Sequence, residues 1–217
     1  MSLYLSRLVL NPYSRQVQTE LWDSYQMHRT LSKAFGAERE VWEAARMLFR
    51  VDEINGKPTV LVQSKIRPDW SYLNVLDGYL AEYPAVKDYD PLIHPGQVLR
   101  FRLRANPTKK IAKVDAEGNV TSARVGLFGE EKQMGWLRRK AGENGFELIE
   151  DKCEIVAIGN FDSKKSGISG KIRHLGVTFE GILMVTEPEK FKRALANGIG
   201  SAKGFGFGLL SVAPVGK

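Results

Sequence analysis

The order of the predicted strands and helices constrains the fold of this chain most, because nearly the same order occurs twice. In the first half the hydrophobic patterns predict strand, helix, strand, strand, short helix and strand, over residues 3–10, 14–47, 48–52, 58–63, 68–75 and 78–83. In the second half they predict strand, hairpin, helix, two long strands, short helix and strand, over residues 97–105, 109–127, 130–143, 146–159, 171–185, 188–196 and 209–212. Strand, helix, strand, strand, helix, strand is the order of a ferredoxin-like domain. The sequence therefore predicts an α+β fold of two tandem ferredoxin-like domains, with a single irregular α+β domain as the alternative.

Two short stretches support this order. Asn55-Gly56 lies between two predicted strands of the first half, where this dipeptide is the strongest short-range hairpin signal. In the first strand of the second half, three apolar residues alternate with three arginines, namely Leu99, Phe101 and Leu103 with Arg100, Arg102 and Arg104. Because strand side chains alternate with period two, the arginines line one face of this strand and the apolar residues line the other.

A segment with three prolines separates the two halves. Residues 84–96 show no periodic pattern, so the sequence predicts domains at residues 1–83 and 97–217 joined by this linker. Charge is divided unevenly between the halves. Residues 1–96 hold 11 Lys and Arg against 12 Asp and Glu, a net charge of −1, whereas residues 97–217 hold 21 against 13, a net charge of +8. A basic half indicates nucleic acid as a partner before it indicates a membrane, and solubility alone is the alternative explanation.

The composition is that of an ordinary globular protein, with 43% hydrophobic and 26% charged residues over 217 positions. No apolar run approaches the roughly 20 residues of a membrane-spanning helix, and the N-terminal run contains Arg7 and no small-residue cleavage signal. The single cysteine, Cys153, excludes an internal disulfide and a cysteine-based zinc cluster. We expect a cytoplasmic protein that does not contact a membrane.

Residues 24–33 hold the most suggestive chemical pattern. At helical spacing the apolar and polar side chains separate onto two faces, formed by Met27, Leu31, Ala34 and Phe35 and by Tyr25, His28, Arg29 and Ser32. An imidazole moves protons near neutral pH, and a guanidinium beside it can bind a phosphate with two hydrogen bonds. From this stretch alone two interpretations stay open: an acid–base site that holds a phosphate, or a surface helix whose polar face includes a histidine.

Residues 198–208, which we call the glycine-rich loop, contain five glycines. Glycines allow backbone N–H groups to turn inward and surround an anion. The loop follows a predicted helix and precedes a predicted strand, whereas a Walker loop or a dinucleotide fingerprint follows a strand and opens a helix. A phosphate backbone lying across the loop, with Lys203 adding charge, is one interpretation, and a loop that needs glycines for close packing is the other.

No combination of residues predicts a metal or cofactor site. The three histidines, His28, His94 and His174, are far apart in sequence, and His174 lies in a strand-like run where a structural role is the simpler interpretation. Common serine-hydrolase, zinc-protease and paired-cysteine motifs do not occur. Any catalysis is therefore most simply metal-free acid–base chemistry that needs no cofactor.

Several sequence motifs occur in a characteristic order along nearly the full length of the chain. They are Asn11-Pro12 after the first strand, Tyr25-x-x-His28-Arg29-Thr30-Leu31, Phe101-Arg102-Leu103-Arg104-Ala105-Asn106-Pro107, Phe179-Glu180-Gly181, and the tail from Gly198-Ile199-Gly200-x-x-Lys203 to Gly208-Leu209-Leu210-Ser211-Val212-Ala213-Pro214. With these motifs the chain resembles the Cas6e endoribonucleases of type I-E CRISPR systems, a family also called Cse3 or CasE.

The resemblance implies a fold, an activity and partners. It implies tandem ferredoxin-like (RRM-like) domains that cut the CRISPR repeat transcript at the base of a hairpin and release mature CRISPR RNA (crRNA). The implied reaction is metal-independent: the ribose 2′-hydroxyl attacks the adjacent phosphate, which leaves a 2′,3′-cyclic or 3′ phosphate and a 5′-hydroxyl. DNA is then no substrate, because it lacks the 2′-hydroxyl. The enzyme is expected to stay on the hairpin as a subunit of the Cascade surveillance complex.

The resemblance also implies roles for individual residues. His28 becomes the principal acid–base residue, its direction of proton transfer left open, and Tyr25 orients it or serves as the complementary group. The expected RNA contacts are Arg29, Lys33, Arg102, Arg104, Lys164, Lys165, Lys171, Arg173, Gly198, Gly200, Lys203 and Gly204. The four basic residues of the 160–173 segment resemble the family's basic hairpin that enters the groove of the RNA stem. For the strand arginines, a solvated face or a face between domains is the alternative.

Two rival functions remain at this point. The first is a non-catalytic subunit that binds an RNA hairpin with the same fold, which would not need His28 and Tyr25. The second is a metabolic enzyme that binds a nucleotide cofactor at the glycine-rich loop, for which the strand–loop–helix context is missing.

Overall fold

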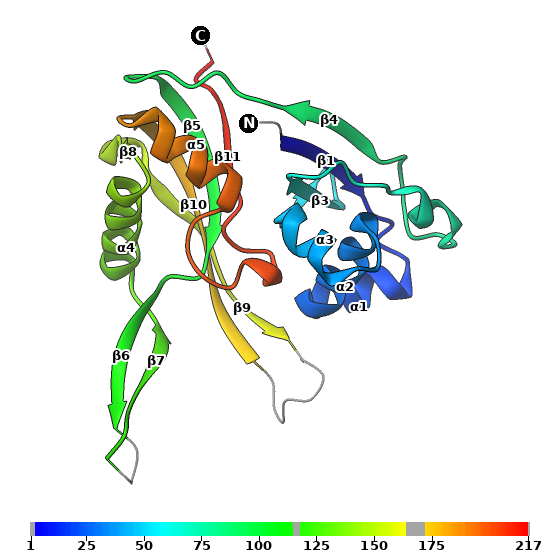
Figure 1. Cartoon of the computed structure of the whole chain (residues 1–217), viewed down its shortest axis with the longest axis horizontal. Coiled ribbons are helices and arrows are strands. Elements are labelled where there is room, and N and C mark those ends of the chain that lie inside the picture. The colour runs from blue at the N-terminus through cyan, green and yellow to red at the C-terminus, as the bar shows by residue number, and fades with distance from the viewer. Residues whose placement is uncertain (1–2, 115–117, 164–171, 217) are drawn as a thin grey trace.

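The computed structural model of the chain describes residues 3–114, 118–163 and 172–216, and its first half is a four-stranded antiparallel sheet covered by helices on one face (Figure 1). The elements of this half are β1 (Leu3–Val9), α1 (Arg15–Trp22), α2 (Ser24–Ser32), η1 (Lys33–Phe35), α3 (Arg39–Ala45), β2 (Leu48–Ile54), β3 (Lys57–Ser64), η2 (Ser71–Val75) and β4 (Ala85–Tyr89). The strands lie in the order β2-β3-β1-β4. Each strand that is central in the sheet thus pairs with the neighbours expected for a ferredoxin-like domain.

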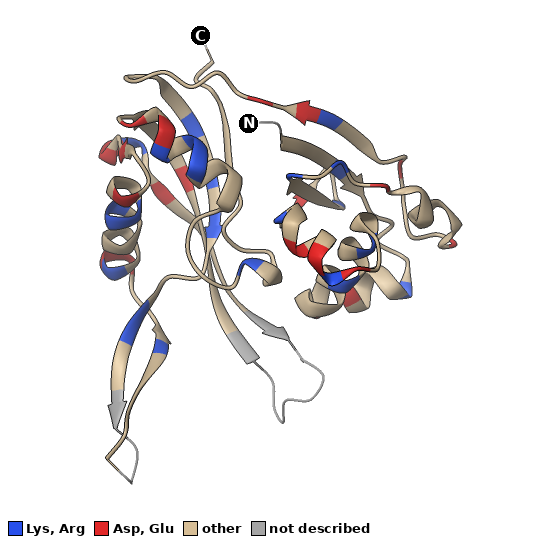
Figure 2. Cartoon of the chain, viewed as in Figure 1, with Lys and Arg blue, Asp and Glu red and all other residues tan. Residues whose placement is uncertain are grey.

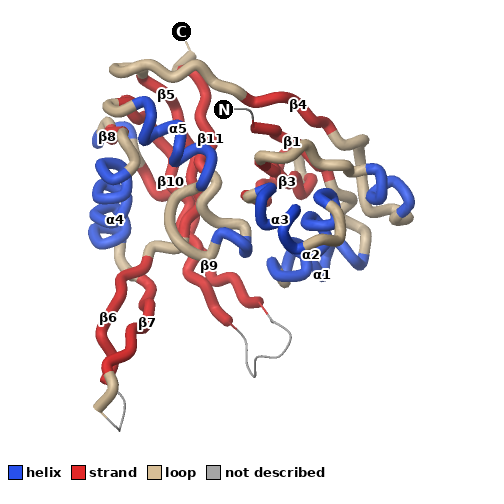
Figure 3. The backbone as a smooth tube through the Cα atoms, viewed as in Figure 1, coloured by secondary structure: helices blue, strands red, loops and turns tan. Residues whose placement is uncertain are grey.

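The second half repeats this arrangement with two additions. Its elements are β5 (Val98–Ala105), β6 (Thr108–Val114), β7 (Val120–Gly126), α4 (Glu130–Glu143), β8 (Phe146–Leu148), η3 (Glu150–Lys152), β9 (Glu154–Ser163), β10 (Ile172–Val185), α5 (Pro188–Asn197), η4 (Lys203–Phe205) and β11 (Leu210–Pro214). The main sheet has the order β11-β5-β10-β8, and β9 pairs with the N-terminal part of β10. The hairpin β6–β7 forms a separate two-stranded sheet that projects from the body (Figure 3). The prediction of tandem ferredoxin-like domains is confirmed.

The local signals of the first half correspond to distinct features of the backbone. Asn55 and Gly56 both have positive φ, at +52° and +71°, as a two-residue type I′ turn requires, and they join β2 to β3. The helical run of residues 14–36 is divided at Asp23, where α1 ends and α2 begins. The side chain of Asp23 accepts a hydrogen bond from the N–H of Tyr25 at 3.0 Å and so caps α2.

The predicted strand near residues 78–83 was wrong. In this stretch the described chain makes only an isolated bridge between Leu80 and Leu10, and the fourth strand of the sheet is β4, inside the predicted linker of residues 84–96. β4 pairs with β1 alone and is largely exposed, so it carries little of the apolar pattern that identifies a strand in sequence. That each half folds as an independent domain stays a prediction.

Two hydrophobic cores lie between the sheets and their helices. The apolar helix face predicted in the first half is buried, with Met27 and Leu31 at 1% and 0% exposure in a core that also contains Phe49. The apolar face predicted for β5 lies in the second core, whereas its arginines lie on the opposite face of the sheet. Within the described residues no helix has the length and apolar character needed to cross a membrane.

The two halves meet on the side of the first sheet where β2, its edge strand, and the neighbouring β3 lie. The Gln63 amide donates a 2.6 Å hydrogen bond to the carbonyl of Leu195 at the end of α5, and Lys65 contacts Asn197 at 3.1 Å. The glycine-rich loop leaves α5 and passes between the halves, where η4 contacts α2 and β2 before the chain enters β11 (Figure 1). This path carries a loop of the second half to the helix that bears His28.

Candidate active site

The helix that carries His28 is fixed to its surroundings by a buried carboxylate. Glu20 of α1 is 4% exposed and accepts hydrogen bonds of 2.6 Å from the hydroxyls of Thr30, on α2, and Tyr79. Tyr72 also donates a 2.6 Å hydrogen bond to the carbonyl of Thr30. Because a buried carboxylate is tolerated only when it is hydrogen-bonded, this cluster defines one position for α2 relative to α1.

His28 points from α2 toward the glycine-rich loop. A Cβ added at Gly204 would lie 3.9 Å from its Cε1 atom and 4.0 Å from its Nε2 atom. The imidazole stacks on Phe49 with a centroid distance of 6.3 Å and meets the edge of Trp42 at 6.4 Å. Residues 28 and 204 are thus brought together from opposite halves of the chain.

Burial favours the neutral form of the His28 imidazole, which can accept a proton. Burial lowers the pKa of His28 below its usual value, so the ring is neutral at pH 7. Its buried Nδ1 atom has no hydrogen-bond partner among the described residues, and its Nε2 atom lies 3.5 Å from the Ser32 hydroxyl. That hydroxyl donates to the carbonyl of His28 at 2.8 Å. Nδ1 is buried, so Nε2, which faces Gly204, is the ring nitrogen that a reacting group can approach.

A cleft of about 610 Å³ opens at His28 between α2, α3 and the glycine-rich loop. Its wall includes Ser32, Trp42, Arg46, Ala202 and Lys203. Arg46 and Ala202 have left-handed backbone with φ of +48° and +60°, and these are two of the three such residues other than glycine within the described chain. Left-handed backbone in a residue with a Cβ costs about 1–3 kcal/mol and is concentrated at functional sites. The strain is thus concentrated around the same cleft.

The glycine-rich loop presents both charge and backbone donors to this cleft. The N–H groups of Gly200, Ser201 and Ala202 have no hydrogen-bond partner within the part of the chain that the structure describes. Burial and the nearby cations Arg46 and Lys140 lower the pKa of Lys203. A bound anion would offset the repulsion among these cations, so this end of the cleft suits a phosphate.

A second, larger cleft of about 750 Å³ adjoins the first and shares Gly200, Ser201 and Lys203 with it. Its basic side chains are Lys109, Lys110, Arg124, Arg139, Lys140 and Lys203, and Glu143 is its acidic one. These residues come from the base of the β6–β7 hairpin, from α4 and from the loop, which appear as blue bands in Figure 2. The sequence did not single out the residues of the hairpin and α4, because only the fold places them beside the loop.

Ser32 of the predicted polar face lines the cleft with His28, but the other predicted site residues of this stretch, Tyr25, Arg29 and Lys33, do not. Arg29 and Lys33 line a different groove, formed with α1, and Arg29 contacts Gln26 at 3.2 Å. Residues 28 and 29 differ by about 100° around a helix, so they do not share one narrow face. Tyr25 lies one turn before His28, half-buried, and no described residue forms a hydrogen bond with its phenol.

The strand arginines face the first half of the chain. The Nε atom of Arg102 lies 3.0 Å from Glu180 on β10 and 3.7 Å from Asp52 on β2, with the geometry of an ion pair and not of a hydrogen bond. Burial lowers the pKa of Arg104 to about 10. The alternative of a face between domains therefore describes Arg102 better than a contact with RNA alone.

The remaining predicted contacts divide into three groups. Lys164, Lys165 and Lys171 lie outside the described residues, and the backbone of Arg173 lies opposite that of Asp162 in the β9–β10 ladder. Gly198 and Gly200 are needed for packing, because an added Cβ would lie 2.8 Å from the carbonyl oxygen of Gly208 and 3.1 Å from Trp136, respectively. Gly204, in contrast, is open toward His28, so the loop contains both kinds of glycine.

His174 has the structural role that its position in a strand suggested. Its Nδ1 atom lies 3.3 Å from the Asn106 amide, and its ring contacts Phe205 at a centroid distance of 4.6 Å. It therefore contacts the glycine-rich loop at Phe205, one residue after the glycine that faces His28. Among the described residues no group of three or more His, Cys, Asp or Glu side chains could hold a metal ion.

The fold and the site define a class of protein: two ferredoxin-like halves, with a histidine and a basic, glycine-rich loop where they meet. Known proteins of this kind are similar to the chain. The family described as CRISPR associated protein matches residues 3–214. CRISPR-associated endoribonuclease Cse3 of Thermus thermophilus is 40% identical over 98% of this chain and its own full length. CRISPR system Cascade subunit CasE of Escherichia coli is 33% identical over 98% of this chain and its own full length.

A solved structure of Thermus thermophilus Cse3, bound to an RNA that represents a pre-cleavage complex, is also similar. It has a TM-score of 0.83 and 38% sequence identity, and the match covers 99% of this chain and 100% of that chain. The chain described here therefore belongs to the Cse3/CasE family of CRISPR-associated proteins, also called Cas6e.

Proposed function

We propose that this protein is an endoribonuclease that cuts CRISPR repeat RNA at the base of a hairpin, without a metal ion, and releases mature crRNA. The observation that carries the proposal is the approach of His28 to the glycine-rich loop, which places a neutral imidazole beside cations and free backbone N–H groups. Relatives whose names describe a CRISPR-associated endoribonuclease and a Cascade subunit match nearly its full length, which supports the same function.

The geometry suits attack by a ribose 2′-hydroxyl on the adjacent phosphate. This step needs a group that accepts the 2′-hydroxyl proton, and the lowered pKa of His28 makes it a base at neutral pH. The developing charge on the phosphate oxygens needs fixed donors, which Lys203 and the N–H groups of residues 200–202 can supply. The leaving 5′-oxygen needs a proton, for which our candidate is the phenol of Tyr25, one helical turn from His28 and outside the wall of its cleft.

The adjoining basic cleft gives the RNA stem a path to this site. Its cations lie on α4 and at the base of the β6–β7 hairpin and continue to Lys203, next to His28. A row of phosphates along this surface would bring the strand beyond the stem into the His28 cleft. We expect recognition to depend on the shape of the hairpin and on its backbone, with Arg29 and Lys33 as further contacts outside the cleft.

After cleavage we propose that the protein keeps the hairpin and acts as a subunit of Cascade in the cytoplasm, since a relative is named as such a subunit. A non-catalytic subunit that binds the RNA hairpin is the second candidate. The basic cleft would serve such a subunit equally well, but the neutral His28 would have no purpose in it.

The test is cleavage of a type I-E repeat hairpin in EDTA by the wild type and by the His28→Ala variant, with a second substrate that carries a 2′-deoxy nucleotide at the cut site. We expect the wild type to cut the normal RNA, and both changes to abolish cutting while binding persists. Tight binding by the wild type with no cutting at all would instead favour the non-catalytic subunit. Cutting that requires added metal would refute the proposed mechanism.

A further inference from the structure

Two consecutive residues of β2 contact the C-terminal part of the glycine-rich loop and the strand that follows it. Phe49 and Arg50 point to opposite faces of the sheet, as neighbours in a strand do. On one face, the Phe49 ring stacks with His28, and a Cβ added at Gly206 would lie 3.1 Å from its Cε2 atom. Phe49 therefore touches both the candidate base and the part of the loop next to it.

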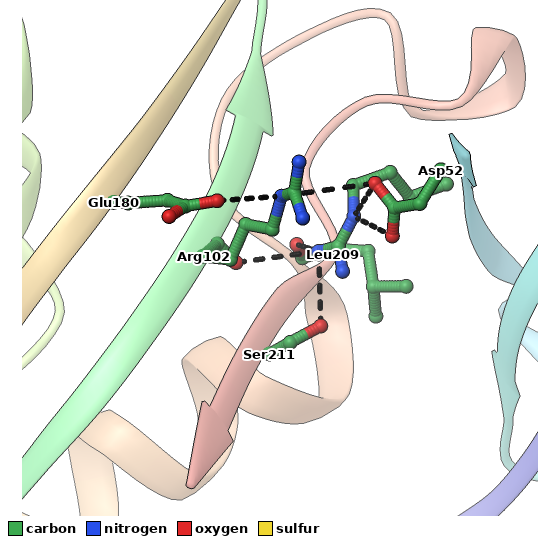
Figure 4. Close-up of polar contacts among 6 residues, drawn as sticks. Asp52, Arg102, Glu180, Leu209 and Ser211 are labelled. Atoms are coloured by element: carbon green, nitrogen blue, oxygen red, sulfur yellow. Dashed lines mark hydrogen bonds and ion pairs between the residues drawn. The ribbon is translucent and has the colours of Figure 1, made fainter. Parts of the chain in front are cut away.

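On the other face, Arg50 reaches into the second half of the chain. It is 4% exposed, and its Nε–H group donates to both carboxylate oxygens of Asp52, at 3.0 and 2.8 Å. Its Nη1 atom donates to the Ser211 hydroxyl at 2.9 Å and to the carbonyls of Arg102 at 3.3 Å and Leu209 at 3.5 Å. Figure 4 shows these contacts, with Arg102 between Asp52 and Glu180.

Two of the residues that Arg50 contacts, Leu209 and Ser211, lie at the base of the loop. Leu209 directly follows the loop and Ser211 is two residues further on, in β11. The base is closed by a 2.9 Å hydrogen bond from the N–H of Ile199 to the carbonyl of Gly208, and the N–H of Gly208 donates to the carbonyl of Arg104 on β5 at 2.7 Å. Because the base is tied to β5 and β11, Arg50 fixes β2 to the same frame that carries the loop.

We propose that Arg50, held by Asp52, is a positioning residue that sets the distance between His28 and the glycine-rich loop. β2 holds His28 through Phe49, and it holds the base of the loop through the planar fork of Arg50. A substitution of Arg50 would shift the loop relative to the imidazole, although it changes no residue of the loop and leaves His28 itself unchanged. The effect on cleavage rests on the proposed function, whereas the effect on the surroundings of His28 does not.

A purely stabilising role is the alternative, and the physical chemistry does not favour it. A buried ion pair often contributes little net stability compared with apolar residues of the same volume, because both charges lose their hydration. Its fixed geometry is its more distinctive property, since the guanidinium presents donors in one plane at set angles. A lysine has one charged nitrogen and cannot reproduce the contacts to Asp52, Ser211 and the two carbonyls together.

The experiment compares three variants of the full chain with the wild type: Arg50→Lys, Ser211→Ala and Gln63→Met. The last is the matched control, because the buried Gln63 also joins the two halves but contacts the end of α5 and not the base of the loop. For each protein we would measure the single-turnover cleavage rate at saturating enzyme, the affinity for the hairpin, the melting temperature, and the pKa of His28 by NMR of its Cε1–H group.

We expect Arg50→Lys and Ser211→Ala to lower the cleavage rate by roughly 10- to 100-fold with little change in RNA affinity, because displacement of a catalytic group by about 1 Å costs rates of this size. We also expect the pKa of His28 to rise toward its usual value as the loop uncovers the ring. Gln63→Met should lower the melting temperature without either effect.

The proposal is overturned if both test variants lose thermal stability like Gln63→Met while the cleavage rate and the pKa of His28 stay at wild-type values. Should Arg50→Lys fail to fold, Ser211→Ala decides the question alone, because it removes one hydroxyl from a half-buried position. A wild type that never cuts would refute the proposed function, and the pKa of His28 in the variants would still test the positioning role.

Discussion

Gly208 and Gly204 lie in the same loop but should respond in opposite ways to replacement by alanine. Gly208 has φ of +87°, and a Cβ there would lie 2.8 Å from the carbonyl oxygen of Ile199. Ile199 cannot easily move away, because its N–H group donates to the carbonyl of Gly208. Gly204 has no left-handed backbone, and its added Cβ would meet only His28, at an ordinary contact distance of 3.9 Å.

The expected loss of stability follows from these two terms. Left-handed backbone costs an alanine about 1–2 kcal/mol. Overpacking against a backbone atom that cannot move adds about 1–3 kcal/mol. Gly208→Ala should thus lower the free energy of unfolding by roughly 2–5 kcal/mol, which for a chain of this length corresponds to a fall of about 4–20 °C in melting temperature. Gly204→Ala should stay within about 0.5 kcal/mol of the wild type, as substitutions without strain or burial usually do.

The assay is thermal unfolding of both variants by circular dichroism, together with cleavage of the repeat hairpin. Gly204→Ala places a methyl group beside the His28 imidazole, where we propose that the phosphate lies, so it should slow cleavage while the melting temperature is preserved. A Gly208→Ala variant that melts within about 1 °C of the wild type would refute the packing argument, because the predicted strain is at least several times larger. Full activity in Gly204→Ala would show that no substrate atom occupies that space.

The remaining predictions concern pH, backbone strain and salt. Burial lowers the pKa of His28 and His174, so the unfolded chain binds more protons than the folded chain near and below about pH 6.5. The free energy of unfolding, measured by urea titration, should therefore fall as the pH drops from about 7.5 to about 5.5. Replacing both histidines by glutamine should flatten this dependence. Ala202→Gly should raise the free energy of unfolding by up to about 1–2 kcal/mol in the same titrations, because it relieves left-handed backbone. Lys203→Gln should weaken hairpin binding and make the slope of log affinity against log salt less steep by about one unit, the contribution of one phosphate contact. An unchanged slope would show that Lys203 does not contact the RNA.

The sequence predicted those parts of the fold that depend on local periodicity. The alternation of Leu99, Phe101 and Leu103 with arginines indicated the correct strand and the correct buried face, and the spacing of Met27 and Leu31 indicated the correct helix face. These predictions succeed because one buried face imposes a period that the chain must follow.

The features that the sequence missed depend on contacts between distant segments. β4 lies at the edge of its sheet and is mostly exposed, so no apolar pattern identifies it. The sequence left Arg102 open between a contact with RNA and a face between domains, because its partners, Asp52 and Glu180, lie in strands that the sequence could not place opposite it. In the same way, nothing in the local sequence of α4 indicates that Lys140 adjoins a cleft shared with Lys203.

The candidate site exists only where the two halves meet, and this explains why its chemistry could not be derived from either half. His28 alone is an imidazole on an amphipathic helix, and the glycine-rich loop alone is a cationic turn with unpaired N–H groups among the described residues. The approach of the loop to α2 buries the ring, which lowers the pKa of His28, and at the same time brings donors for a phosphate within reach of the imidazole. The proton acceptor and the anion site are far apart in sequence, and β2, the edge strand of the first sheet, holds them together by contacting both. A mutation of Arg50 in that strand should therefore change cleavage even though its side chain does not contact the imidazole.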